Sequence, residues 1–574
     1  MPHPSTLVLC ALLVTKTVCF AFVGVAPSVG LGGKILTLPR SASGAAPISQ
    51  TAERRVRRTT HELQQQQQHQ YRDLGGRHGS RGDMRRGRGI LATADDDEDG
   101  EEVLPARTPV VTNIKGPERI CVLGGGFGGL YAALRLQKMP WRGQKPIVTL
   151  VDKRDKFTFL PLLYEFAIGN AELDEVAPTF RELLAGSGVS FVQGCVSDVD
   201  LGEKEVTMVG ATSDDLDGFM ISDDADQART IKYDKLVLAV GAEPASSIDK
   251  VPGARERAIP FYSIEDSFRV KQAITKLKVL VRETAVARVV VVGGSYAGVE
   301  LSCNLATELG GRRGPGKVEV TLATGSEVLS AATPGNREAG LRRLEESGVR
   351  VMTGTRVAEV RENGVVVLQP KQEAEVAGSS ADDGEEIMAD LLVWTAGSQP
   401  SSLVESLDVP KDLRGRIEVD RRLRLVSAAV GEGDGRAGGV GAAGDVYCLG
   451  DIAAVEGLDL GCNAQVALQQ SDYVAYNIWA DKERRRPLDF RFLNLGEMMN
   501  LGGLDGSVTT LGGRVKLTGK AAGLARRAVY AIRMPTNPQR VRAAASAAAG
   551  TAFSVTNALL EKGLDVLERA SEKE

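Results

Sequence analysis

One local pattern occurs twice in this chain, and the repetition constrains the fold more than any other feature. In each copy a short apolar stretch (119–123, 289–292) leads into a glycine-rich turn (124–129, 293–298) and then into an apolar helical pattern. A strand that passes through such a turn into a helix places the helix N-terminus at a dinucleotide pyrophosphate. The two copies therefore predict two dinucleotide sites in an α/β fold.

The first copy contains every element of such a site. Gly124 suits the tight turn, Gly126 lets the backbone approach a pyrophosphate, and Gly129 lets strand and helix pack closely. The next apolar stretch, 147–151, ends at Asp152, where a carboxylate suits a ribose hydroxyl. The other predicted cofactor contacts of this copy are Phe127, Gly128 and Lys153.

The second copy departs from the pattern at two positions. Ser295 occupies the middle-glycine position of the turn, which otherwise comprises Gly293, Gly294, Ala297 and Gly298. The following stretch, 318–323, ends at Thr324, where a site that prefers NADH usually has an acid. No carboxylate repels a 2′-phosphate there, and no neighbouring arginine attracts one, so we expect the site to tolerate both NADH and NADPH.

Three further strand ends carry small residues in the expected order. The stretch 235–240, which includes Ala239, precedes Gly241; 391–395 precedes Ala396 and Gly397; and 446–449 precedes Gly450 and Asp451. Each turn alone is an ordinary strand exit. In their order relative to the two glycine motifs, the turns after 235–240 and 391–395 fit a chain that leaves one domain and later re-enters it. The Asp451 carboxylate can accept hydrogen bonds from ribityl hydroxyls of a flavin.

Composition excludes several kinds of chemistry. All four histidines precede Ser80, so histidine-dependent catalysis and histidine-ligated zinc are excluded from the rest of the chain. The seven cysteines contain no C-x-x-C pair, which argues against a disulfide framework or structural metal. The formal net charge of -4 disfavours nucleic-acid binding. No long apolar run free of charge suggests a membrane-spanning helix.

Residues 1–110 are predicted to be a disordered targeting leader. Residues 1–90 carry 13 Lys and Arg against 4 Asp and Glu. They also contain an early apolar segment, 7–14, and a glutamine run. The segment resembles the two-part plastid leader of algae with secondary plastids, with the transit peptide beginning near Phe22. A mitochondrial presequence and a secretory signal are the alternatives.

Longer passages resemble one family, the type II NAD(P)H:quinone dehydrogenases, and within it the plastid-targeted C class of plants and algae. They include ICVLGGGFGGLYAALRL, FTFLPLLYE, VVVVGGSYAGVEL, LLVWTAGSQP and AQVALQQSDYVAYNIWA. The resemblance covers nearly all of 118–540. It implies FAD in the first unit, NADH or NADPH as co-substrate in the second, and a non-proton-pumping enzyme that reduces a membrane quinone such as plastoquinone or another prenylquinone.

The resemblance also implies roles for residues outside the turns. Glu300 would face the nicotinamide side and steady the charge around reduced flavin or nicotinamide; the alternative is a solvated helix residue. Gln465 and Gln469 match the A-Q-x-x-x-Q pattern and, with Ala464, would lie beside the flavin, with both glutamine amides donating to quinone carbonyls; the alternative is surface polarity on the helix 464–479. No metal ligand is predicted.

Two other functions remain open from the sequence. A sulfide:quinone reductase would need a cysteine pair near the flavin, and only Cys448 and Cys462 lie in suitable regions. A redox sensor with slow turnover is the second alternative. A disulfide reductase is disfavoured, because residues 152–194 contain no cysteine pair.

The C-terminal segment is expected to touch a membrane. Arginines 526, 527, 533, 540 and 542 surround apolar residues, and 553–567 contains an amphipathic helical pattern; a docking helix or a homodimer contact is the alternative. The expected location is peripheral on thylakoids or plastid lipid bodies, or else mitochondrial. The predicted divisions are a leader (1–110), a FAD domain in two parts (111–250, 401–485), an inserted NAD(P)H domain (251–400) and a C-terminal region of hairpin and amphipathic helices (486–574).

Overall fold

In the computed structural model, the described residues are 116–212, 228–245, 247–283, 286–309, 317–370, 384–426 and 443–548. The predicted leader and the amphipathic pattern at 553–567 lie outside them. The first sheet has seven strands in the order β18-β6-β1-β2-β3-β4-β5, parallel from β18 to β3. Its strands are β1 (Arg119–Leu123), β2 (Ile147–Asp152), β3 (Val189–Asp200), β4 (Glu205–Thr212), β5 (Arg229–Lys232), β6 (Lys235–Leu238) and β18 (Val446–Cys448).

A second, fully parallel sheet comes from the chain between β6 and β18. Its order is β11-β10-β9-β15-β8. The strands are β8 (Ile259–Pro260), β9 (Val286–Val292), β10 (Lys317–Ala323), β11 (Arg350–Met352) and β15 (Leu391–Trp394). An antiparallel sheet of β12 (Thr355–Val360), β13 (Val365–Pro370) and β14 (Glu385–Met388) comes from the same stretch. The second sheet is therefore formed by a segment inserted between two strands of the first sheet.

Two short two-stranded pairs lie outside these sheets, and the first of them lies at the crossings between the two large sheets. One pairs β7 (Ala242–Pro244) with β16 (Ser398–Pro400), and these strands directly follow the predicted exits at Gly241 and Gly397. The other pairs β17 (Ile417–Val419) with β19 (Ala453–Val455). The outgoing and returning segments are therefore bonded to each other, as expected for an inserted domain.

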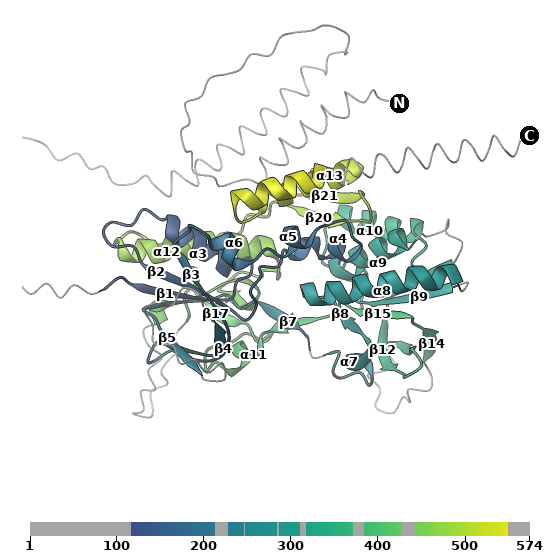
Figure 1. The fold of residues 1–574 in the computed structure, drawn as a ribbon, viewed down its shortest axis with the longest axis horizontal. Helices are drawn as coiled ribbons and strands as arrows, with labels where there is room; N and C mark the ends of the chain where they lie inside the picture. The colour runs from purple at the N-terminus through teal and green to yellow at the C-terminus, as the bar shows by residue number, and fades with distance from the viewer. Residues whose placement is uncertain are drawn as a thin grey trace, which may run out of the picture. The chain divides into compact units, whose positions relative to one another are not determined.

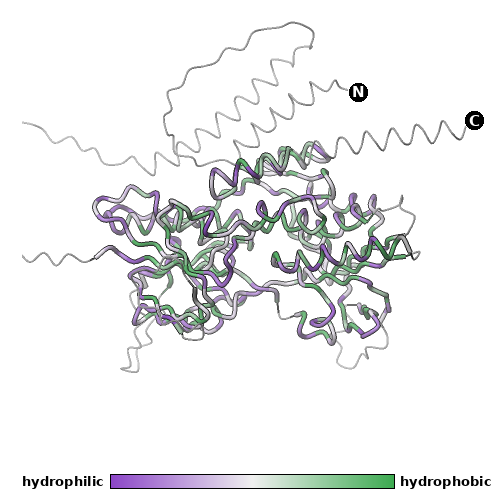
Figure 2. Tube along the Cα trace, viewed as in Figure 1, coloured by the Kyte–Doolittle hydropathy of each residue, from purple (hydrophilic) through white to green (hydrophobic). Residues whose placement is uncertain are grey.

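Helices cover the sheets, and Figure 1 shows α3, α6 and α12 along one side of the strands β1, β2 and β3. The helices are α3 (Gly129–Lys138), α4 (Leu163–Ala167), α5 (Leu173–Val176), α6 (Phe180–Leu184), α7 (Ala254–Arg257), α8 (Ile264–Glu283), α9 (Tyr296–Glu308), α10 (Pro334–Glu346), α11 (Ser402–Ser406) and α12 (Ala464–Lys482). The central strands of both sheets are buried, and Figure 2 shows their apolar character in its hydropathy colours. Continuous apolar strands are typical of parallel sheets covered on both faces.

The C-terminal part packs on the body as a small sheet and one helix. The strands β20 (Glu497–Asn500), β21 (Gly506–Thr510) and β22 (Val515–Gly519) form an antiparallel sheet, and α13 (Lys520–Arg533) lies against it. Gly506 and Gly523 touch at this contact, since a Cβ on Gly506 would lie 3.0 Å from the Gly523 nitrogen. Within the described residues, no helix is long and apolar enough to cross a membrane.

Candidate functional site

The first glycine turn connects β1 to α3 and leaves no room for side chains on its inner side. A Cβ on Gly124 would lie 2.3 Å from the Ala239 carbonyl oxygen, and a Cβ on Gly129 would lie 1.9 Å from that of Gly124. Gly126, in contrast, is exposed and has no atom within 4 Å of its Cβ position. The turn is therefore closed toward the sheet and open where a phosphate would approach.

Asp152 lies at the end of β2, beside that turn. Its carboxylate accepts hydrogen bonds from the Gly125 N–H at 2.7 Å and the Arg154 N–H at 2.8 Å. Each oxygen keeps a free lone pair, so the group fits a ribose hydroxyl as a further donor. Lys153 instead extends outward, pairing with Glu243 at 3.1 Å.

Phe127 and Gly128 support the turn from inside the protein. The Phe127 ring packs edge-on against Phe157 and Phe159, with centroids 5.3 and 5.2 Å away. A Cβ on Gly128 would meet the Leu449 side chain at 2.3 Å. Both residues therefore shape the site from the core.

Asp451 supplies the strongest fit to the ribityl chain of a flavin. It follows Gly450, whose N–H donates to the Gln470 Oε1 atom at 2.6 Å. Burial alone raises the pKa of the Asp451 carboxyl, and no hydrogen bond to this carboxylate occurs within the described residues. A desolvated acceptor without donors fits the hydroxyls of a bound cofactor. Ala464 follows Asp451 later in the chain, as the first residue of α12.

The second glycine turn repeats the first, between β9 and α9. A Cβ on Gly298 would lie 1.7 Å from the Gly293 carbonyl oxygen, and one on Gly293 would lie 2.7 Å from the Thr395 hydroxyl. Ala297 lies in the first turn of α9, while Ala396 and Gly397 follow β15 beside Gly293. Ser295 is exposed. The turn therefore fits a second dinucleotide.

Thr324 lies at the end of β10, where the first unit has Asp152. It is buried, and a Cβ on Gly294 would lie 2.7 Å from its hydroxyl. The Leu329 N–H also donates to the Gly294 carbonyl at 2.8 Å. The loop after β10 therefore folds onto the glycine turn with an uncharged residue at the ribose position.

Gln465 and Gln469, on successive turns of α12, hold the segment 493–496. Gln465 donates from Nε2 to the Gly496 carbonyl at 3.0 Å and accepts the Leu495 N–H at 2.9 Å. Gln469 donates to the Leu493 carbonyl at 2.8 Å and accepts the Leu493 N–H at 2.9 Å. In each glutamine, the side-chain amide oxygen and one amide N–H thus hydrogen-bond to the backbone. Contact of these amides with a quinone stays a prediction.

Glu300 is buried on α9, with 6% of its surface exposed, so it is not a solvated helix residue. Its Oε1 accepts the Asn500 N–H at 2.7 Å, and it also hydrogen-bonds Tyr164. Burial raises the pKa of Glu300 to about 7, while the Asn500 N–H and the Arg526 charge oppose that rise. A carboxyl with this pKa exchanges protons readily near neutral pH.

A buried ionic cluster surrounds Glu300, and the sequence did not predict it. Arg526 pairs with Glu165, to which Asn500 also donates at 3.2 Å; both charged side chains are only 2% exposed. Arg526 lies 5.1 Å from the Tyr530 ring centroid, and its Nε and Nη1 are buried without a hydrogen-bond partner. Those two donor groups leave the cluster ready for a further acceptor.

This cluster corrects the interpretation of the C-terminal arginines. Arg526 and Arg527 do not face a lipid surface: Arg527 pairs with Glu165 and, at 3.5 Å, with Glu175, and both arginines are largely buried. Val529 and Met534 are buried as well. The prediction of one basic surface is therefore wrong for these two arginines, because their side chains pair with Glu165 on α4 and Glu175 on α5 instead.

Comparisons with known proteins agree with the presence of two dinucleotide-binding turns. The sequence profile of the pyridine nucleotide-disulphide oxidoreductases matches residues 118–471. This chain belongs to that family. Demethylphylloquinone reductase NdbB of Synechocystis is 35% identical over 73% of this chain and 92% of its own length. The alternative NAD(P)H-ubiquinone oxidoreductase C1 of Arabidopsis thaliana, chloroplastic/mitochondrial, is 34% identical over 78% of this chain and 83% of its own.

The predicted resemblance to type II dehydrogenases is thereby confirmed, and with it FAD as cofactor and NAD(P)H as co-substrate. The solved structure of NDH2 from Plasmodium falciparum in complex with NADH superposes with a TM-score of 0.59 at 16% identity, over 75% of this chain and 97% of that chain. This similarity confirms the α/β fold. The domain boundaries, the individual site residues and the C-terminal membrane region stay predictions.

Proposed function

We propose that this chain oxidises NAD(P)H and passes the electrons through FAD to a membrane quinone, without pumping protons. The main observation is the pair of glycine turns. In each, the last glycine packs on the carbonyl oxygen of the first, and the middle residue, Gly126 or Ser295, is exposed where a phosphate would approach. Two relatives, one named a demethylphylloquinone reductase and one an NAD(P)H-ubiquinone oxidoreductase, support the same reaction. A plastid prenylquinone is the proposed acceptor.

The chain's own residues bind and orient the two dinucleotides. Asp152 and Asp451 would hold FAD through its ribose and ribityl hydroxyls, and Gly293 and Gly298 would let the nucleotide approach α9. When bound, FAD would supply the redox chemistry that links hydride transfer from the nicotinamide to electron transfer to the quinone. The protein's main task is to hold the two rings together and exclude water.

Quinone reduction consumes protons, and the buried cluster is suited to deliver them. Glu300 has a pKa of about 7 and hydrogen-bonds Tyr164, so it can give a proton at neutral pH and regain one. The two unpaired N–H groups of Arg526 are suited to a carbonyl oxygen of the substrate. We propose that Glu300 and Arg526, together with the second N–H of Gln465 and Gln469, form the quinone side of the site.

The proposed location is the plastid, on the surface of thylakoids or lipid bodies. The basic, acid-poor leader and the name of the Arabidopsis relative, chloroplastic/mitochondrial, support a plastid or a mitochondrion. A lipid-soluble substrate favours peripheral contact with a membrane, to which Arg540 and Arg542, exposed after α13, are suited.

The test is flavin reduction followed by oxidation. NADH or NADPH is added to the flavin-loaded protein, and the flavin absorbance is followed before and after a short-chain plastoquinone or naphthoquinone. Bleaching by nucleotide and rapid recovery with quinone are expected. Bleaching without recovery would overturn the quinone assignment and favour the redox sensor. Bleaching of the flavin by sulfide in place of NAD(P)H, lost when Cys448 and Cys462 are replaced by Ser, would favour the sulfide:quinone reductase.

A further inference from the structure

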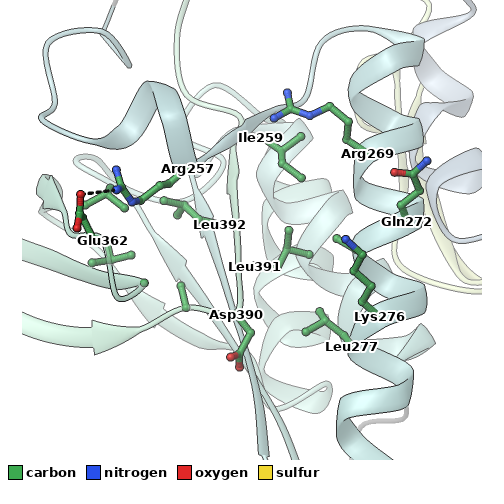
Figure 3. Close-up of a pocket in the computed structure, with 15 residues that line it drawn as sticks. Arg257, Ile259, Arg269, Gln272, Lys276, Leu277, Glu362, Asp390, Leu391 and Leu392 are labelled. Atoms are coloured by element: carbon green, nitrogen blue, oxygen red, sulfur yellow. Dashed lines mark ion pairs between the residues drawn. The ribbon is translucent and has the colours of Figure 1, made fainter.

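A cavity of about 490 Å³ lies in the inserted domain, at the opposite ends of the strands from the glycine turns. It is lined by α7, α8, β8, the β12–β13 hairpin and the start of β15, as Figure 3 shows. Leu391 and Leu392 line it at the first residues of β15, whereas the turn at Ala396 and Gly397 follows the last. Dinucleotides bind at the carboxyl ends of parallel strands, so this cavity is a separate site.

Its floor is apolar and its two walls carry cations. Ile259, Leu391 and Leu392 lie between the walls in Figure 3. One wall is a single stripe of α8 with Arg269, Gln272 and Lys276, spaced three and four residues apart. Arg257, from the end of α7, faces it from the other side.

The acids nearby leave these cations available. Glu362 meets Arg257 only at 3.7 Å and is 97% exposed, so this pair contributes little. Arg269 meets Asp266 at 3.8 Å. Asp390 accepts the Arg288 N–H at 2.7 Å, and Lys276 has no ion pair within the described residues. The lining therefore carries three cations, Arg257, Arg269 and Lys276, against two acids, Glu362 and Asp390, so it is net positive above an apolar floor.

We propose that this cavity is an effector site for an anion with an apolar body, such as a medium-chain alkyl carboxylate or alkyl phosphate. Its volume lies in the range of small-molecule sites. The floor would bury the apolar body, and the cations would bind the headgroup through charge-assisted hydrogen bonds.

The same elements reach the buried cluster around Glu300. Phe261 directly follows β8, and its ring stacks on Tyr164 with centroids 5.5 Å apart. On α8, the Ser267 hydroxyl donates to the Leu163 carbonyl at 2.9 Å, and both groups are buried. A ligand between α8 and β8 therefore contacts two elements that hold α4, the helix of Tyr164 and Glu165. Occupancy should change turnover without competing for either substrate.

Octanoate and octyl phosphate are the probes, and calorimetry on the flavin-loaded full chain is the first measurement. We expect saturable binding of one molecule per chain, with octanol and octylammonium at least about tenfold weaker. The double variant R269Q/K276Q should bind about tenfold more weakly or worse, while R342Q, at an exposed position of α10, should bind as wild type. A273F keeps every cation but fills the cavity, and should abolish binding.

The second measurement is steady-state quinone reduction with each probe. We expect a saturable change of about twofold or more in kcat, with both KM values unchanged, that disappears in A273F. The absence of saturable binding, or binding that survives A273F, would overturn the site. Binding without a change in kcat, or competition with the quinone, would overturn its role as an effector site. Calorimetry needs no quinone reduction, so failure of the proposed reaction is separately visible.

Discussion

The two glycine turns have the same backbone and different neighbours. In both units the last glycine packs against the carbonyl oxygen of the first glycine. A Cβ built on the last glycine would lie 1.9 Å from that oxygen in the first unit and 1.7 Å from it in the second. The equivalent strand then ends at Asp152 in the first unit and at Thr324 in the second. Two residues past the last glycine, the first unit has Tyr131 and the second has Glu300.

This comparison separates what forms a turn from what selects a ligand. The glycines satisfy close packing and are therefore shared. The acid in the first unit carries a charge beside the turn, whereas Thr324 offers a hydroxyl. Tyr131 and Glu300 both reach the C-terminal part: the Tyr131 hydroxyl donates to the Arg533 carbonyl, and Glu300 accepts from Asn500. Of these two residues, only Glu300 in the second unit exchanges a proton near neutral pH.

Valine at the last glycine should separate the two sites most sharply. G129V should lose bound flavin, while G298V should retain flavin but lose reduction by NADH about 100-fold, because a branched side chain displaces the turn by more than the site tolerates. The flavin-to-protein absorbance ratio and the bleaching rate measure these effects. Flavin retained in G129V would contradict the assignment of FAD to the first unit.

Removing the buried cation beside Glu300 should cost the most stability. R526M breaks the buried Arg526–Glu165 ion pair and leaves Glu165 with Arg527 as its remaining cation; removing one partner of a buried pair typically costs about 3–5 kcal/mol. Denaturant unfolding checks this, with R514M on the exposed β21–β22 turn as the control, expected to be near neutral. Equal effects of the two variants would contradict the buried cluster.

An acid at Thr324 should make the second unit resemble the first and exclude NADPH. T324D should lower kcat/KM for NADPH by roughly 30-fold, about 2 kcal/mol of repulsion against the 2′-phosphate, and affect NADH much less. Initial rates with both nucleotides measure the ratio, with T324S as the control. An unchanged ratio would place the 2′-phosphate elsewhere.

Glu300 should make turnover depend on pH near 7. The pKa of Glu300 lies about 7 in the folded protein and near 4.5 when solvated, so the folded state holds the extra proton and the free energy of unfolding falls as pH rises through this window. E300Q should lose the inflection in kcat near pH 7. Its melting temperature relative to wild type should also rise from pH 5 to pH 8. An E300Q profile identical to wild type would remove Glu300 from the proton path.

Lys153 should matter least, although it follows the acid of the first unit. Its pair with Glu243 is exposed, so K153A should change stability by less than about 0.5 kcal/mol and leave flavin binding unaltered. Flavin content and melting temperature measure this. Loss of flavin would show that Lys153 moves onto the cofactor.

Glu300 and Arg526 show why part of the site escaped prediction. Arg526 lies 361 residues from Glu165, and no local pattern links them. One signal was available: Arg526 falls four residues after Ala522 and three before Val529, on the buried face of α13. A charged residue on an apolar helical face is a candidate for a buried pair.

The sequence by itself determined the two turns and the strands beside them. Those features depend on contacts within about 25 residues, where glycine spacing and apolar runs act directly on the backbone. Only the tertiary structure decided which charges are buried, since Glu165, Glu300 and Arg526 come from three distant elements. The free energy of a buried charge depends on the partners that desolvate with it, and chain folding alone brings those partners together.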